Sequence, residues 1–184
     1  RLLSSTTSLK QMLFGLVFAD ADLRLNPKPG EEILRSLQGT FNLRLNEGKL
    51  AGVNLLNEMA KLGRFLGYSN RSEAYTNIVR LTGGMRIGEG VASTDDLKLE
   101  FEGGSLAAAG TIGLADQALK LRTTAVIAKP FADRFGGNKV GGYMTTVLAN
   151  PQGELILPCL VGGSLAKPSF SPDGEQFARL KLQN

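Results

Sequence analysis

Four consecutive segments between residues 77 and 128 alternate apolar and polar side chains, and this pattern constrains the fold more than any other feature. The segments cover residues 79–87, 97–101, 106–114 and 119–127. Successive side chains of a β-strand point to opposite faces, so the alternation predicts a sheet with one apolar and one polar face. The connections contain Gly or Asp and are too short for crossover helices. The sequence therefore predicts an antiparallel meander.

Helices are predicted on both sides of this meander. Residues 4–18 and 53–66 carry apolar side chains at helical spacing, which is typical of helices with one buried stripe. Residues 31–37 begin with two acids, which favour the first turn of a short helix. Residues 173–182 are expected to form a terminal helix.

Further short strands are also expected. They lie at residues 19–25, 40–45, 49–51, 145–149 and 154–161. Residues 46–48 are expected to form the turn of a hairpin between the strands at 40–45 and 49–51. Proline cannot donate a hydrogen bond to a sheet, so the strand that holds Pro158 is expected at an edge or a bulge. Residues 129–142 contain Pro130 and two Gly-Gly pairs, which predict a flexible loop.

Together these elements predict the fold class. We expect a mainly β (α+β) domain, a curved antiparallel sheet or meander of about 7–9 strands with two or three covering helices. Residues 1–184 would form this single domain. The chain begins with Arg1 rather than Met, so we expect it to be a fragment of a longer chain.

Composition bears on several classes of function. Histidine is absent, which removes the commonest general base and metal ligand. The lone Cys159 lies in an apolar run, where it is expected to be a small buried hydrophobe, without an internal disulfide or a cysteine-based zinc site. We therefore expect no metal and no cofactor. A net charge of +4 spread along the chain, without basic clusters, argues against nucleic-acid binding and is compatible with anionic lipid headgroups.

Several segments that contain turns between the strands follow one another in a particular order and spacing. They are Leu37–Phe41 running through Asn46–Leu55, Tyr75–Gly83, Gly90–Leu99 followed by Ala109–Leu114, and Leu157-Pro158 followed by Val161–Asp173. Taken in order, they cover residues 37–173, most of the chain, and resemble the C-terminal region of the AsmA family of bacterial envelope proteins.

This resemblance implies a location and a role. Members of the family are held in the bacterial inner membrane by an N-terminal helix, with most of the protein in the periplasm of the Gram-negative envelope. They are similar to TamB and YhdP and to bridge-like lipid carriers, whose curled sheets hold acyl chains in an apolar groove. The associated role is outer-membrane biogenesis and phospholipid transport. We expect neither the anchor nor the long N-terminal groove of the family within these residues.

The first hypothesis is therefore a lipid-handling module without chemistry of its own, whose partners are phospholipids or acyl chains. An acyl chain would lie on the apolar face of the sheet, where burial of apolar surface needs no catalysis. The alternative for each residue is ordinary core packing beneath the helices at 4–18 and 53–66. The candidate groove residues are Leu97, Leu99, Phe101, Leu106, Ala108, Ile112, Leu114, Leu119 and Leu121.

Two other classes of function were weighed. A structural or docking module would cap or extend a β-sheet through its edges and bind envelope protein partners, without lipid. An enzyme finds little support, so catalytic residues are expected to be absent. The carboxylate pair Asp95-Asp96 is expected in a solvated turn, and residues 136–142 lack the strand, helix and Lys-Ser/Thr ending of a phosphate-binding loop.

Overall fold

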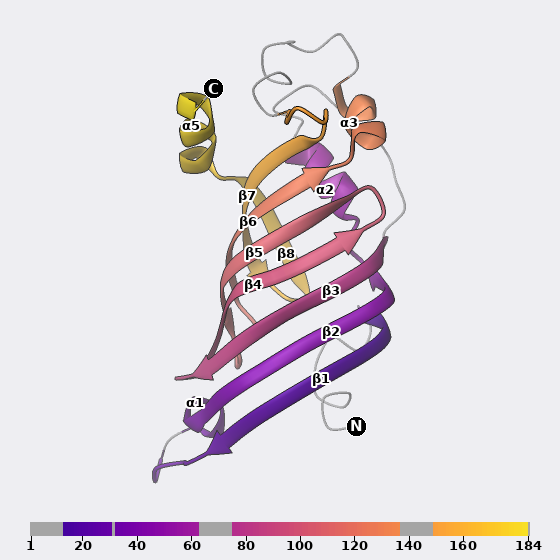
Figure 1. Cartoon of the computed structure of the whole chain (residues 1–184). Helices are drawn as coiled ribbons and strands as arrows, with labels where there is room; N and C mark the ends of the chain where they lie inside the picture. The colour runs from indigo at the N-terminus through magenta and orange to yellow at the C-terminus, as the bar shows by residue number, and fades with distance from the viewer. Residues whose placement is uncertain (1–12, 31, 63–74, 137–148, 184) are drawn as a thin grey trace.

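The computed structural model describes residues 13–30, 32–62, 75–136 and 149–183, which form one curved β-sheet with short helices (Figure 1). The elements are β1 (Leu13–Leu25), α1 (Ile33–Ser36), β2 (Leu37–Ala51), α2 (Leu55–Leu62), β3 (Tyr75–Gly88), β4 (Val91–Phe101), β5 (Gly104–Gly113), β6 (Leu119–Ile127), α3 (Lys129–Gly136), β7 (Leu155–Ser164), β8 (Lys167–Pro172) and α5 (Gly174–Gln183). The predicted fold class, a curved and mainly β antiparallel fold, is confirmed.

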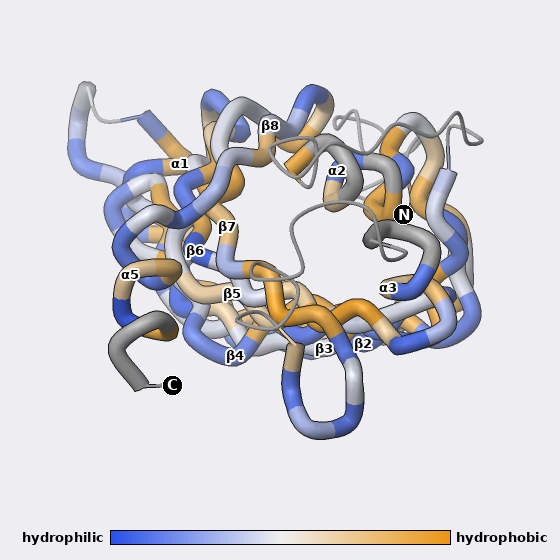
Figure 2. The backbone as a smooth tube through the Cα atoms, turned by 90° about the horizontal axis from the view of Figure 1, so that it is seen from above, coloured by the Kyte–Doolittle hydropathy of each residue, from blue (hydrophilic) through white to orange (hydrophobic). Residues whose placement is uncertain are grey.

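The strands are arranged as a meander. All eight belong to one sheet whose spatial order, β1 to β8, is the order of the sequence, and every neighbouring pair is antiparallel. Glu89 and Gly90 connect β3 to β4 as a two-residue turn, and both have positive φ, as tight hairpins require. Seen from above in Figure 2, the sheet curls so that β8 lies across from β3 and β4. The curl gives the sheet an inner and an outer face.

The strand register separates apolar from polar side chains. Residues that lie opposite one another in seven successive strands form a row across the sheet. One such row, on the inner face, is apolar, and the adjacent row, on the outer face, is mostly polar. The inner row is Val17, Leu45, Leu81, Leu99, Leu106, Ala125 and Leu157; the outer row is Phe18, Arg44, Thr82, Lys98, Ala107, Thr124 and Pro158. The predicted alternation therefore does generate one apolar face.

Two predictions for the N-terminal part of the chain were wrong. Residues 13–18 belong to β1 instead of the predicted helix at 4–18, whose first part lies outside the described residues. Residues 46–48 do not end a strand, because β2 runs without a break to Ala51. Glu47, with a φ of 50°, and Gly48 together face the single residue Gly15 of β1 as a β-bulge. The Asn-Glu-Gly segment therefore produces a bulge within a long strand.

The C-terminal part also differs from expectation. Residues 129–136 form helix α3 in place of the first part of the predicted loop, and 137–142 lie outside the described residues. Pro158 lies in β7, which is internal because it pairs with both β6 and β8. However, the β8 ladder ends opposite Cys159, and the carbonyl of Pro158 accepts from the N–H of Asp173 beyond that end. Pro158 therefore occupies a position where β8 requires no N–H donor.

The remaining predicted helices agree with the structure. Helix α2 lies within the predicted range 53–66, α1 within 31–37, and α5 covers most of 173–182. Residues 63–66 and 145–148 lie outside the described residues. Helix α2 contacts both β3 and β8, so it lies on the concave side of the sheet (Figure 1).

Candidate functional site

The candidate groove residues lie on the inner face, but most of them belong to a packed core. Phe101, Leu106 and Ala108 are buried in the main hydrophobic cluster, and Leu97 and Leu99 pack against it. Leu119 and Leu121 are buried in a second cluster with Val161, against which Ile112 packs. Leu114 follows β5, is half-buried and belongs to neither cluster. The structure thus separates the nine residues into two groups and one outlying leucine.

Helix α2 covers the first of these groups. Its side chains Leu55 and Met59, together with Val53 just before the helix, are buried in the same cluster as Phe101 and Leu106. Ile127 of β6 and Cys159 of β7 also belong to this cluster, and neither has exposed surface. We call this covered inner face of β4–β7 the closed half of the sheet. Its side chains pack against protein atoms and leave no exposed strip there for a ligand.

A buried threonine joins the start of α2 to the sheet. The buried Thr76 of β3 donates its hydroxyl hydrogen to the carbonyl of Val53 at 2.8 Å, and its oxygen accepts from the N–H of Leu55, also at 2.8 Å. These backbone groups belong to the start of α2, where helices leave N–H groups without internal partners. Thr76 thereby satisfies the helix terminus from another element and fixes where α2 lies.

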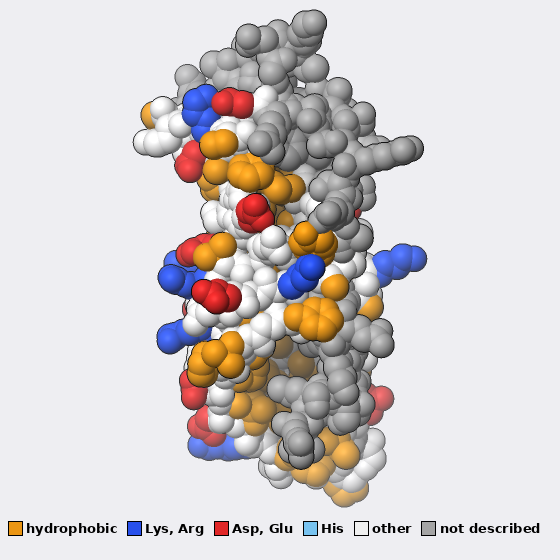
Figure 3. Space-filling model, turned by 90° about the vertical axis from the view of Figure 1, so that its right-hand side faces the viewer, with side chains coloured by type: hydrophobic (Ala, Val, Ile, Leu, Met, Phe, Trp, Pro, Cys, Tyr) orange, Lys and Arg blue, Asp and Glu red, His pale blue; other side chains and the backbone are white. Residues whose placement is uncertain are grey.

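The inner face of β1–β3, which we call the open half, is covered less, although Leu45 of β2 and Ile78 of β3 are buried. In β1, the inner-face side chains Val17, Leu23 and Leu25 are 45%, 41% and 58% exposed. Apolar inner-face side chains of β2 and β3, such as Phe41 and Met85, are half-buried. Hydrophobic side chains gather around a hollow in the lower part of Figure 3, at the level of β1–β3 in Figure 1. Exposed apolar surface of this kind often marks a binding site.

Sequence reasoning missed the open half as a candidate site, although a signal for it was present. Residues 19–25 and 40–45 alternate as clearly as the central meander does. They were predicted as strands, but nothing local indicates that α2 covers β4–β7 and leaves the inner face of β1 exposed. Ile33 and Leu34 of α1, which joins β1 to β2, add further exposed apolar surface.

The carboxylate pair has a structural role that differs from the prediction. Asp95 and Asp96 lie within β4 at a bulge, not in a turn before a strand. Asp96 accepts a hydrogen bond from the N–H of Gly84 at 2.8 Å, and Asp95 forms an ion pair with Arg86 at 3.2 Å. Asp96 thereby supplies an acceptor to β3 where the bulge interrupts the regular ladder.

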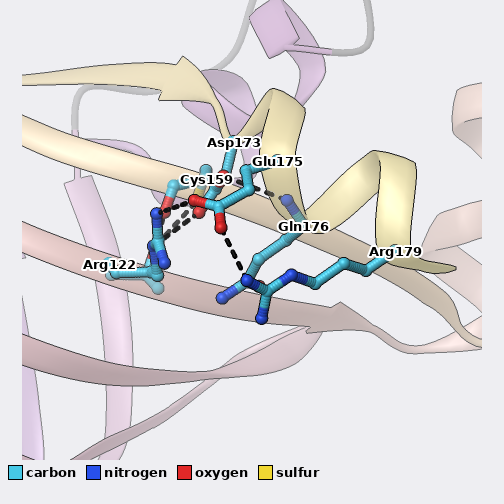
Figure 4. A network of polar contacts seen from close by, with 7 residues as sticks. Arg122, Cys159, Asp173, Glu175, Gln176 and Arg179 are labelled. Atoms are coloured by element: carbon cyan, nitrogen blue, oxygen red, sulfur yellow. Dashed lines mark hydrogen bonds and ion pairs between the residues drawn. The ribbon is translucent and has the colours of Figure 1, made fainter.

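A polar network holds α5 to the sheet (Figure 4). The almost fully buried Asp173 accepts from the N–H of Gln176 at 3.2 Å, as an N-cap residue does, and its Oδ2 lies 2.8 Å from Nε of half-exposed Arg122. That Nε–H is not well aligned for a hydrogen bond, but charge attraction depends on distance, so the contact is an ion pair. Glu175 bridges Arg122 and Arg179 at 2.9 and 2.6 Å.

Cys159 is a buried core residue next to this network. Burial raises the pKa of its thiol above the ordinary 9.0, a hydrogen bond with Thr123 opposes the shift, and the nearby charge of Asp173 adds to it. The thiol therefore stays protonated at neutral pH, which does not favour nucleophilic reactivity.

On the outer face, Asp22, Arg24, Gln38, Gly39 and Thr40 line a hollow of about 300 Å³ between β1 and β2. Its charged and polar lining suits water better than an apolar ligand.

Comparisons with known proteins do not assign the chain to a family. No family model, curated protein or solved structure matches it. Within the described ranges, His, Cys, Asp and Glu form no group of three or more that could hold a metal ion. The helices in the part of the chain that the structure describes are all too short or too polar to span a membrane.

Proposed function

We propose that this chain is a non-enzymatic module of an AsmA-like envelope protein that shields phospholipid acyl chains on the inner face of its sheet. The proposed process is phospholipid transport in outer-membrane biogenesis. A periplasmic location and an anchor of the parent protein in the inner membrane follow from the sequence resemblance alone. The observation that supports lipid handling is the uneven cover of the inner face, which is closed over β4–β7 and exposed along β1.

The open half has suitable dimensions and chemistry for an acyl chain. The 13 residues of β1 span roughly 43 Å at ~3.3 Å per residue, well beyond the ~15 Å of one bilayer leaflet. Transfer of an acyl chain onto exposed apolar side chains is favourable by ~25 cal/mol per Å² of buried surface. Of the residues proposed from the sequence, those in the closed half lie beside the site and would contact lipid only if α2 moved.

Native mass spectrometry with lipid extraction of the purified chain tests this proposal. Phospholipid that co-purifies in a defined stoichiometry would support it. A lipid-free mass that is unchanged after incubation with phospholipid vesicles would contradict it, because the exposed face would then be unable to hold an acyl chain.

A matched pair of variants locates the site. Leu23→Lys places a charge on the exposed inner face of β1 and should abolish lipid binding while the fold is retained. Thr40→Lys makes the same charge change on the outer face of the neighbouring strand and should leave binding intact. Equal loss of lipid in both variants would show that net charge, rather than the inner face, governs binding.

A second candidate function, extension of the sheet by another strand, is favoured by the unequal edges of the sheet. The β8 edge is short, 6 residues, and carries Lys167, Pro168 and Pro172, all features that block strand pairing. The β1 edge is 13 residues long and contains neither Pro nor Lys. Natural sheets usually protect such a long edge, so β1 is suited to receive a partner strand.

A further inference from the structure

The structure shows which backbone groups of β1 face its unpaired edge. The carbonyl oxygen of Phe14 points at Gly48 of β2, and that of Asp22 points at Gly39 of β2, since a Cβ added to either glycine would collide with it. Both residues are even-numbered. Within an antiparallel strand, the N–H and C=O of one residue point to the same side, and the side alternates from residue to residue.

The odd-numbered residues of β1 therefore direct their N–H and C=O groups away from β2. Among the residues that the structure describes, no strand pairs with that side of β1. The bulge opposite Gly15 lies in β2, so this alternation continues along the whole of β1. The edge thus offers a long row of donors and acceptors without interruption.

The first part of β1 is also apolar on the face where the sheet is otherwise polar. Phe14, Leu16 and Phe18 lie on the outer face and are 52%, 64% and 52% exposed. The neighbouring positions on β2 are Lys49, Asn46 and Arg44, so the apolar surface is confined to the edge strand. Strands that are apolar on both faces are usually internal to a sheet, where a neighbouring strand lies on each side. Such a strand at an edge is therefore suited to pair with a further strand.

We propose that the edge of β1 that no described strand occupies pairs antiparallel with β1 of a second copy of this chain, centred on Ala19. This inference rests on the second candidate function, sheet extension, and names its partner. Centring on Ala19 aligns all 13 residues of β1 with their counterparts. The resulting interface is two-fold symmetric, with the same strand contributed by both copies.

Side-chain size and charge favour this register. On the inner face, small residues meet large ones: Gly15 lies opposite Leu23 of the second copy and Val17 opposite Ala21. On the outer face, Arg24 lies opposite the ring of Phe14, where a cation–π contact is favourable. The other outer-face pairs set Asp22 opposite Leu16 and Asp20 opposite Phe18, so no two like charges meet. The pairing also joins the inner faces of the two copies into one apolar surface.

Registers centred further toward the C-terminal end of β1 place like charges opposite each other, whereas registers centred on residue 17 or 18 leave the last residues of β1 without a counterpart. Centring on residue 20 or 22 sets an aspartate against its own counterpart, and centring on residue 21 sets Asp20 against Asp22. Like charges directly opposite each other destabilise a strand pair. The register centred on Ala19 avoids all three clashes and uses the full strand.

Ala19→Pro tests the pairing by sedimentation velocity over a wide range of concentrations. The wild-type chain should dimerise, and the variant should dimerise about tenfold or more weakly, since proline removes the N–H at the centre of the proposed pair. The monomer should remain folded because that N–H faces away from β2. Asp20→Pro is the control, because the N–H that it removes faces β2 instead of the proposed partner. This variant should destabilise the monomer.

Disulfide trapping tests the register and does not depend on how proline is tolerated. In the proposed pair the two copies of Ala19→Cys place their Cα atoms ~5.5 Å apart, within disulfide range, while those of Ala21→Cys are more than ~13 Å apart. The native Cys159 is buried and common to both variants. Fast covalent dimerisation of Ala19→Cys alone is expected; equal rates, or a wild-type chain that stays monomeric at every concentration, would overturn the proposal.

A labelled peptide of residues 13–25 separates this inference from sheet extension in general. A monomeric chain that binds the peptide, as measured by fluorescence anisotropy, would refute the dimer but leave edge pairing intact. A chain that neither dimerises nor binds the peptide would refute both. Neither result affects lipid binding, which native mass spectrometry measures separately.

Discussion

Thr76→Val should loosen the attachment of α2 to the sheet at almost no cost in volume. The substitution replaces the buried hydroxyl by a methyl group and removes both 2.8 Å hydrogen bonds, which leaves the carbonyl of Val53 and the N–H of Leu55 without that partner. An unsatisfied buried polar group costs about 1–3 kcal/mol, so the loss in the free energy of unfolding should be about 2–4 kcal/mol. For a chain of this size the melting temperature should fall by about 5–15 °C.

Urea denaturation gives the free energy, and hydrogen exchange shows whether the amides of α2 lose protection. Thr76→Ser keeps the hydroxyl and should retain most of the stability, whereas Thr40→Val, on the exposed outer face, should change little. A loss below about 0.5 kcal/mol in Thr76→Val would refute the reasoning, because it would mean that water or other groups satisfy the start of α2 equally well.

Three further predictions concern the core and the network at α5. Arg122→Met should cost about 2 kcal/mol in urea denaturation, more than Asp173→Asn, because it leaves a buried carboxylate without its half-exposed cation; equal costs would contradict this. Because burial raises the pKa of the Cys159 thiol, the folded chain keeps a proton that the unfolded chain loses above pH 9.0. The free energy of unfolding should therefore be independent of this thiol below pH 9.0 and should fall above it by up to about 1.4 kcal/mol per pH unit. Denaturation series at increasing pH measure this slope, and Cys159→Ala should remove the part due to the thiol. Leu99→Lys should destabilise the chain by about 3 kcal/mol or more, since Leu99 packs against the closed half; a fully stable variant in thermal denaturation would show that this half opens readily.

The sequence alone was sufficient to predict the sheet where alternation was strict. Residues 119–127 were predicted as a strand and form β6 with the same bounds, and 79–87 lie within β3. In these segments side-chain period, turn residues and burial all agree, so local information was sufficient. The strand count also fell within the predicted range.

The N-terminal strand could not be predicted because its pattern fits two periods. Leu13, Leu16 and Val17 have helical spacing, but Phe14 and Phe18 make the segment apolar on every side. Pairing with β2, which lies outside the segment itself, decides in favour of a strand. Such tertiary pairing commonly outweighs local propensity.

The division of the inner face could not be predicted either. It depends on where α2 lies, and that is set by the contact of Thr76 with the start of a helix more than twenty residues earlier in the chain. In the sequence, Thr76 is one polar residue near the start of an alternating segment. Its role appears only when β3 and α2 are brought together.

The strands lie in the sheet in the same order as in the sequence, which favours folding through contacts between neighbouring parts of the chain. Each strand contacts mainly the strands before and after it, so no pairing has to wait for a distant part of the chain. Folding rates rise as contacts become more local, and a meander is among the more local ways to build a sheet. During synthesis each new strand can add to the preceding one as it leaves the ribosome, from β2 onwards. Among the described elements, the contacts of α2 with β7 and β8 must wait until most of the chain has been made.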